Sequence, residues 1–128
     1  MAKKICIVED DTHLLENYVT ELELLKYKVV TVSDGGKAVA FIKKENPDLV
    51  LLDIMLPNTN GIDILEELRQ DSKFQDLPVV MLTNYGDEDN IRKSLDLGAL
   101  DYLKKYNVTP SDVGQRLEKY LKSAHERE

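Results

Sequence analysis

The chain has 128 residues, 42% of them hydrophobic and 32% charged, a composition typical of one soluble globular domain. Its formal charge of −7 and pI near 4.9 argue against a nucleic-acid surface, which needs a basic stripe, and its single cysteine excludes an internal disulfide and suits a reducing cytoplasm. The apolar run near the N-terminus is too short for a signal peptide or a membrane span, so we expect one cytoplasmic domain over residues 1–128, with 122–128 as a frayed polar tail.

The first half of the chain alternates short apolar runs with amphipathic segments. "KICIV" at 4–8 predicts a buried strand, and apolar residues at helical spacing predict a helix over about 12–26. "KVVTV" at 28–32 predicts a second strand, and "SDGG" breaks the chain before a second helix that begins near Ala38. A proline then separates this helix from a third strand, "DLVLLD" at 48–53.

The second half continues this alternation. Gly61 opens a third helix, and "VVMLT" at 79–83 predicts a fourth strand. "DEDNIRKSLDLG" at 87–98 predicts a fourth helix, with acids at its N-terminus and a glycine past its end. "LDYLKK" at 100–105 predicts a fifth strand, and "TPSD" at 109–112 supplies an N-cap threonine and a proline in the first position of the last helix.

Five strand–helix units in a row, with strands that are apolar on both faces, indicate a parallel sheet covered by helices on both sides. Because crossovers in such sheets are right-handed, the predicted fold class is a doubly wound α/β domain, with a five-stranded parallel sheet flanked by five helices. Ligands bind such folds outside the carboxyl ends of the strands. The polar residues at these ends should therefore meet in one crevice: Glu9, Asp10, Asp11, Asp53, Thr83 and Lys105.

Carboxylates, a hydroxyl and an ammonium in one crevice favour phosphoryl chemistry, although each residue taken singly could be a helix cap or a surface residue. Closely packed carboxylates repel one another and attract a hard cation, and oxygen ligands with open positions suit Mg²⁺. A lysine and a hydroxyl beside the metal are the donors that a transferred phosphoryl group needs, and one carboxylate can be its acceptor. Asp53 is the best candidate acceptor, because it is the lone acid at its strand end and precedes a loop shaped by Pro57.

The chain resembles the receiver domain of two-component response regulators over essentially its whole length. The segments that carry this resemblance are "IVEDD", "LLDIMLPNTNGIDIL", "VVMLT" and "LGALDYLKK". The resemblance implies a flavodoxin-like sheet with strand order 2-1-3-4-5. It also implies that Asp53 is the phosphoacceptor, and that the donor histidine belongs to another protein, a sensor histidine kinase or a phosphotransfer protein.

The same resemblance implies a set of metal ligands. Asp10 would bind Mg²⁺ directly, together with Asp53 and the backbone carbonyl of Met55. Glu9 would act mostly through water. Asp11 matches a variable position of the family and is not included.

The resemblance also assigns residues to the phosphoryl group and to the conformational switch. Thr83 would bond one phosphoryl oxygen, and Lys105 would pair with another. Tyr102 corresponds to an aromatic switch residue that turns inward when Thr83 moves toward the phosphoryl group. Simple packing of Tyr102 on the fifth strand is an equal alternative.

Two departures from the family pattern lie next to the crevice. The family commonly follows its strand-five lysine with proline in a cis peptide, but here the pair is Lys105-Tyr106. A cis bond before a non-proline residue costs about 2.5–4 kcal/mol, so we expect a trans bond and a reshaped loop, with Lys104 as an outside candidate for the phosphoryl contact. In addition, Asn84 follows Thr83 at a position where the family usually has a small residue, and Asn84 and Tyr85 are expected to crowd the phosphoryl group and the water that would hydrolyse it.

The leading functional hypothesis is a phosphorylation-driven signalling switch without an output domain in this chain. It would act through protein contacts and catalyse at most its own phosphorylation and dephosphorylation. The alternative is a receiver-like protein-binding module that does not use phosphate. An enzyme or flavin carrier of similar architecture is disfavoured, because the chain lacks a flavodoxin phosphate loop after its first strand and the D-x-D arrangement of haloacid dehalogenase phosphatases.

The resemblance also locates the partner surface. In this family the face made by the fourth helix, the fifth strand and the fifth helix is the usual one, so we expect the downstream target there. Lys104, Arg116, Lys119 and Lys122 give that end of the protein local positive charge. No nucleic-acid or membrane partner is expected for this chain, and the sequence leaves a homodimer open.

Overall fold

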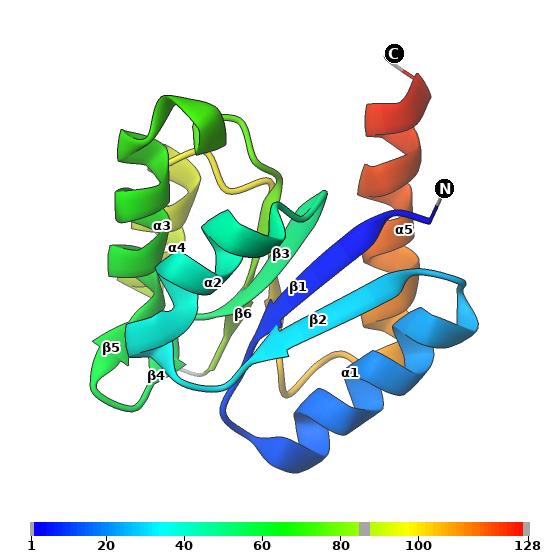
Figure 1. Cartoon of the computed structure of the whole chain (residues 1–128). Coiled ribbons are helices and arrows are strands. Elements are labelled where there is room, and N and C mark those ends of the chain that lie inside the picture. Colours follow the sequence, from blue (N-terminus) through cyan, green and yellow to red (C-terminus); the bar gives the residue numbers. More distant parts are fainter. Residues whose placement is uncertain (1, 85–87, 127–128) are drawn as a thin grey trace.

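A computed structural model describes residues 2–84 and 88–126 of the chain and shows a five-stranded parallel sheet with helices on both faces (Figure 1). The spatial order of its strands is β2-β1-β3-β6-β7, which is the expected order 2-1-3-4-5 when only these five strands are counted. The doubly wound α/β prediction is thereby confirmed. The strands are β1 (Lys4–Val8), β2 (Lys28–Val32), β3 (Leu49–Asp53), β6 (Val79–Thr83) and β7 (Asp101–Lys104).

The helices divide between the two faces of the sheet, so that each face has its own apolar core (Figure 1). α1 and α5 cover one face, and α2, α3 and α4 cover the other. The three central strands are buried along nearly their whole length, as the apolar runs predict. The helices are α1 (Thr12–Leu24), α2 (Ala38–Glu45), α3 (Gly61–Gln70), α4 (Glu88–Asp96) and α5 (Pro110–Glu126). Within the described residues, no helix is both long and apolar enough to cross a membrane.

The helix ends follow from local backbone chemistry. α1 ends at Leu24, slightly before the expected boundary, because Lys26 adopts a left-handed φ of 73° and the next amide, of Tyr27, bonds back to the carbonyl of Leu22 at 3.1 Å. The N-cap predicted for the last helix is confirmed. The Thr109 hydroxyl accepts from the Asp112 amide at 3.1 Å, and the Asp112 carboxylate accepts from the Thr109 amide at 2.9 Å.

The helix α5 extends through Glu126. It therefore includes most of the segment 122–128, for which the sequence predicts a frayed tail. Fraying there stays a prediction. Four short elements escaped the sequence patterns, because two or three residues are too few to show a periodicity. They are the 3₁₀ turns η1 (Gly35–Lys37) and η2 (Ser72–Phe74), and the strands β4 (Met55–Leu56) and β5 (Thr59–Asn60).

The strands β4 and β5 form a small antiparallel hairpin, which we call the 55–60 hairpin. It connects the end of β3 to α3, where the sequence predicts only a loop shaped by Pro57. Asn58 closes the hairpin turn with a left-handed φ of 61°, a conformation that asparagine tolerates better than most residues. The chain that leaves Asp53 is therefore held in a defined shape.

Candidate functional site

Asp53 lies at the carboxyl end of β3, in the middle of the sheet, with only 1% of its surface exposed. All five residues of β3 are buried, so the strand carries this carboxylate into a setting that is apolar on both sides. One oxygen, Oδ1, accepts from the Met55 amide at 3.3 Å. The other, Oδ2, accepts from Lys105 Nζ at 2.8 Å. The acid inside the apolar run is therefore paired.

Lys105 also contacts a second buried acid, Glu9, which follows β1 and is 0% exposed. Glu9 Oε2 lies 2.7 Å from Lys105 Nζ, and Glu9 Oε1 accepts from the Asp11 amide at 3.1 Å. One ammonium thus bridges two carboxylates that reach it from neighbouring strands of the sheet. Two acids and one cation leave the cluster with excess negative charge.

This excess negative charge and the burial change the protonation equilibria of the cluster. Burial raises the pKa of Asp53 from 3.8 to about 7; the Lys105 hydrogen bond opposes the rise and the charge of Glu9 adds to it. Burial alone would lower the pKa of Lys105, but its bonds to Asp53 and Glu9 outweigh that effect and hold this pKa above its usual value. The ammonium is therefore charged at neutral pH.

Glu9, Asp10 and Asp53 form a cluster whose carboxylate oxygens lie within 4.8 Å of one another. Asp10 is exposed and opens the cluster to solvent, whereas the other two acids are buried. Glu9 Oε2 is paired with the ammonium of Lys105 at 2.7 Å. An all-oxygen donor set that combines two buried carboxylates with one open to solvent fits a hard divalent cation. The predicted proximity of these acids is confirmed, and the ligand role of the Met55 carbonyl stays a prediction.

The hydroxyl of Thr83 lies at the end of β6 and is fully buried. It donates to the carbonyl of Leu103 on β7 at 3.5 Å, at the long limit of a hydrogen bond. Tyr102, also on β7, is half-buried and packs against the core cluster on the side of α3 and α4. Thr83 pairs with Lys104 and Tyr102 with Met81, so the two residues lie on neighbouring strands two positions apart in register, while their roles in switching stay predictions.

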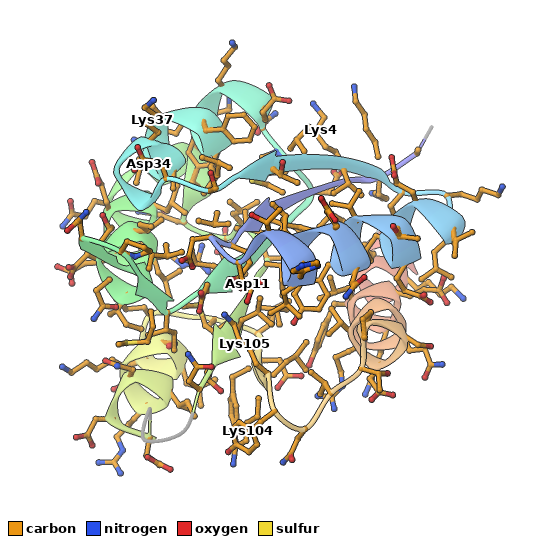
Figure 2. The ribbon with its side chains drawn as sticks, turned by 90° about the horizontal axis from the view of Figure 1, so that it is seen from below. Lys4, Asp11, Asp34, Lys37, Lys104 and Lys105 are labelled. Carbon is orange, nitrogen blue, oxygen red and sulfur yellow. The ribbon has the colours of Figure 1, made fainter. Side chains whose placement is uncertain are left out.

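The ammonium that reaches Asp53 belongs to Lys105 and not to Lys104. In Figure 2 Lys105 lies nearer the middle of the view, whereas Lys104 lies toward its lower edge. Among the described residues no peptide bond is cis, so the bond between Lys105 and Tyr106 is trans, as expected. Tyr106, the next residue along the chain, is 38% exposed.

The second departure, Asn84, is exposed immediately after β6. Tyr85 lies outside the described residues. Crowding of a phosphoryl group by this pair stays a prediction.

Sequence reasoning missed two features of the site region. Asp11 matches a variable position of the family, yet its amide donates to Glu9 Oε1 at 3.1 Å and its side chain caps α1 by accepting from the Leu14 amide at 3.0 Å. A backbone contribution of this kind leaves no residue-type signal. At the start of β7, Asp101 Oδ2 accepts from two side chains of α5, Arg116 at 2.6 Å and the Tyr120 hydroxyl at 2.7 Å.

These contacts change the expectation for the positive charge near α5. The charge of Arg116 is offset by Asp101, and Lys122 lies 3.4 Å from Glu118. The face formed by α4, β7 and α5 is therefore less basic than the sequence alone indicates.

Comparisons with known proteins agree with this geometry. A sequence model of the response regulator receiver domain matches residues 5–118. The chain is 37% identical to the phosphate regulon transcriptional regulatory protein PhoB of Pseudomonas aeruginosa, over 95% of this chain and 53% of PhoB. The chain spans about half the length of the curated relatives it matches.

Two solved structures are similar over nearly the whole chain. A CheY-like response regulator receiver domain protein from Methanospirillum hungatei has a TM-score of 0.90 and 30% identity, with 100% of each chain covered. The Mn²⁺-bound form of the response regulator Rcp1 has a TM-score of 0.81 and 29% identity, with 93% of this chain and 94% of that chain covered.

Proposed function

Because the chain belongs to the response regulator receiver domain family, we propose that it is a signalling switch that accepts a phosphoryl group on Asp53. The donor is a sensor histidine kinase or a phosphotransfer protein, and the reaction depends on Mg²⁺. The observation that carries this proposal is the buried cluster in which Lys105 bridges Asp53 and Glu9 while Asp10 opens toward solvent. In a module that had lost phosphate chemistry, two buried acids held on one half-buried ammonium would contribute little to stability.

The chemistry begins at the carboxylate of Asp53. One of its oxygens forms a bond to phosphorus, the donor's bond to the phosphoryl group breaks, and the donor leaves with the electron pair, so the product is an aspartyl phosphate. A pKa of about 7 keeps a sizeable fraction of Asp53 ionised, and therefore nucleophilic, at neutral pH. Mg²⁺ held by Glu9, Asp10, Asp53 and the Met55 carbonyl would neutralise charge on the phosphoryl oxygens.

Two residues would then sense the new group. Lys105 Nζ is already within 2.8 Å of Asp53 Oδ2 and can follow the negative charge onto a phosphoryl oxygen. The Thr83 hydroxyl would give up its long bond to the Leu103 carbonyl, of 3.5 Å, when it turns toward another phosphoryl oxygen. Tyr102 lies on the strand next to Thr83, and its inward rotation would change the face formed by α4, β7 and α5, where we place the downstream target.

Incubation with acetyl phosphate and Mg²⁺ tests this function directly. We expect the intact mass to increase by one phosphoryl group, and we expect no increase when EDTA replaces Mg²⁺. A protein whose mass stays unchanged with Mg²⁺ present would instead be the phosphate-independent binding module.

Mg²⁺ should stabilise the protein, because it binds acids that are clustered only in the folded state. At ten times its dissociation constant, Mg²⁺ should raise the free energy of unfolding by about 1–1.5 kcal/mol, a melting shift of roughly 2–6 °C for a domain of this size. Asp10→Asn should mimic part of this gain in metal-free buffer, since it removes one repelling charge, and should blunt the further response. A wild-type melting temperature that ignores Mg²⁺, or a full response in Asp10→Asn, would contradict the metal site.

A further inference from the structure

The 55–60 hairpin rests against η1, the turn that follows β2 (Figure 1). The two segments meet at Gly35, which is buried, while Asp34 and Lys37 on either side of it are exposed (Figure 2). A Cβ atom added to Gly35 would lie 2.7 Å from Thr59 Cβ and 3.2 Å from Leu56 Cδ1. Only a residue without a side chain allows this contact. Since the φ of Gly35 is not positive, the requirement is for space and not for a special backbone conformation.

The base of the hairpin is held by a different set of contacts. The Gly61 amide donates to the Ile54 carbonyl at 2.7 Å, and a Cβ on Gly61 would lie 2.2 Å from the Asp53 carbonyl oxygen. The Met55 amide donates to Asp53 Oδ1 at only 3.3 Å. The base is thus fixed close to Asp53, whereas the arm made by Leu56 and Thr59 is braced by η1.

We propose that Gly35 is a positioning residue for the metal-binding loop. It lets Thr59 and Leu56 seat against η1, and through this contact it sets the position of the Met55 carbonyl relative to Asp53. The inference rests on the proposed function, in which that carbonyl is a Mg²⁺ ligand. It extends the site to a turn on the other side of the hairpin, which contributes no ligand of its own.

The path from Gly35 to Met55 runs through backbone. Thr59 Cβ is bonded directly to its own main chain, so Thr59 cannot yield to an added methyl group by rotating a side chain. The backbone of β5 or of η1 must move, and a movement of β5 reaches Met55 because β5 pairs Asn60 with Met55 and Thr59 with Leu56. A shift at Thr59 is therefore transmitted to the segment that carries the Met55 carbonyl. Leu56 Cδ1, the far end of a flexible side chain, can move aside at little cost.

Gly35→Ala and Gly36→Ala form a matched pair for testing this. Both replace glycine by alanine in the same 3₁₀ turn, but Gly36 is exposed and an added Cβ there meets only Asp34 Oδ1, at 3.3 Å. We expect Gly35→Ala to weaken Mg²⁺ binding about tenfold, the cost typical of disturbing the groups that orient a metal ligand, as measured by melting shift against Mg²⁺ concentration. Gly36→Ala should bind Mg²⁺ as the wild type does.

Hydrogen exchange in metal-free buffer provides a readout that needs neither metal nor phosphate. The amides of Met55 and Gly61 should lose protection in Gly35→Ala and keep it in Gly36→Ala. The exchange measurement separates the inference from the proposed function. If the wild type fails to bind Mg²⁺, the proposed function is wrong, yet the exchange data still show whether Gly35 holds the hairpin in place. Unchanged protection in Gly35→Ala would overturn the inference.

A substitution on the other side of the contact tests whether Gly35→Ala acts through Thr59 or through a packing defect elsewhere. Thr59→Gly removes the other side of the contact without overpacking and should also loosen the hairpin. The double variant Gly35→Ala/Thr59→Gly exchanges the Cβ atoms across the contact, so its Mg²⁺ affinity and its exchange protection should exceed those of Gly35→Ala alone. A double variant no better than Gly35→Ala would mean that the damage arises elsewhere, and would contradict the proposal.

Discussion

Asp53→Asn should raise the free energy of unfolding by roughly 4 kcal/mol at pH 8 in metal-free buffer, although it removes the proposed phosphoacceptor. The cause is the burial that raises the pKa of Asp53 from 3.8 to about 7. The folded state holds this proton more tightly than the unfolded state does. The native carboxylate is therefore a destabilising group once it is ionised, and the neutral amide has nearly the same shape without the charge.

The sign of the pH dependence follows from the same shift. Below pH 3.8 both states carry the proton and the carboxyl contributes nothing; between 3.8 and about 7 only the unfolded state ionises, so stability falls as pH rises. The advantage of Asp53→Asn over the wild type should therefore grow by about 1.4 kcal/mol per pH unit through this window and level off above it. Urea unfolding of both proteins at about pH 5, 6, 7 and 8 measures this difference in the free energy of unfolding.

Asp96→Asn is the control for this series. Asp96 is an exposed acid at the end of α4, so its replacement should change stability by less than about 0.5 kcal/mol at every pH. A wild-type protein that equals or exceeds Asp53→Asn at pH 8 would show that the Asp53 carboxylate is not destabilising in its buried site.

Lys105→Ala should have the opposite effect and lower the free energy of unfolding by about 3–5 kcal/mol in metal-free buffer at pH 8, because it leaves two buried carboxylates without their shared cation. The fold should survive this loss, and Mg²⁺ should restore more stability to Lys105→Ala than it adds to the wild type, since a divalent ion can replace the missing charge. Phosphorylation of the variant should produce smaller changes in its amide NMR spectrum, because the contact of the ammonium with the phosphoryl group is lost.

The neighbouring Lys104→Ala provides the comparison for Lys105→Ala. Lys104 lies one residue earlier on β7, and its replacement should cost less than about 1 kcal/mol. A larger effect from Lys104→Ala, in stability or in the response to phosphorylation, would mean that the ammonium in the site has been assigned to the wrong lysine.

The parts of the fold that sequence could predict are those that depend on periodicity and caps. The strand "VVMLT" and the helix that begins at "TPSD" follow from apolar patterning and capping chemistry within a few residues, and the structure has both where they are expected. The meeting of Asp53 with Glu9 also follows, because parallel strands bring their carboxyl ends to one edge of the sheet.

The parts that escaped prediction depend on close approach between segments distant in sequence. Gly35 lies in η1 and Thr59 in β5, and no residue pattern near either of them predicts that the two segments come into contact. The meeting of Lys105 with the two acids was predicted, but its bridging of both carboxylates was not, because that contact depends on where β7 ends relative to β1 and β3. The ion pair between Arg116 and Asp101 offsets a positive charge that the sequence alone counts as unpaired.

The most direct test of the central claim is the intact mass of the wild type and of Asp53→Asn after incubation with acetyl phosphate and Mg²⁺. Asp53 is the buried acid that Lys105 holds at the carboxyl end of β3, so we expect the wild type to gain one phosphoryl group and Asp53→Asn to gain none. Melting of Asp53→Asn in the same buffer confirms that the variant is folded. Full labelling of folded Asp53→Asn would place the phosphoryl group on another residue and contradict the account.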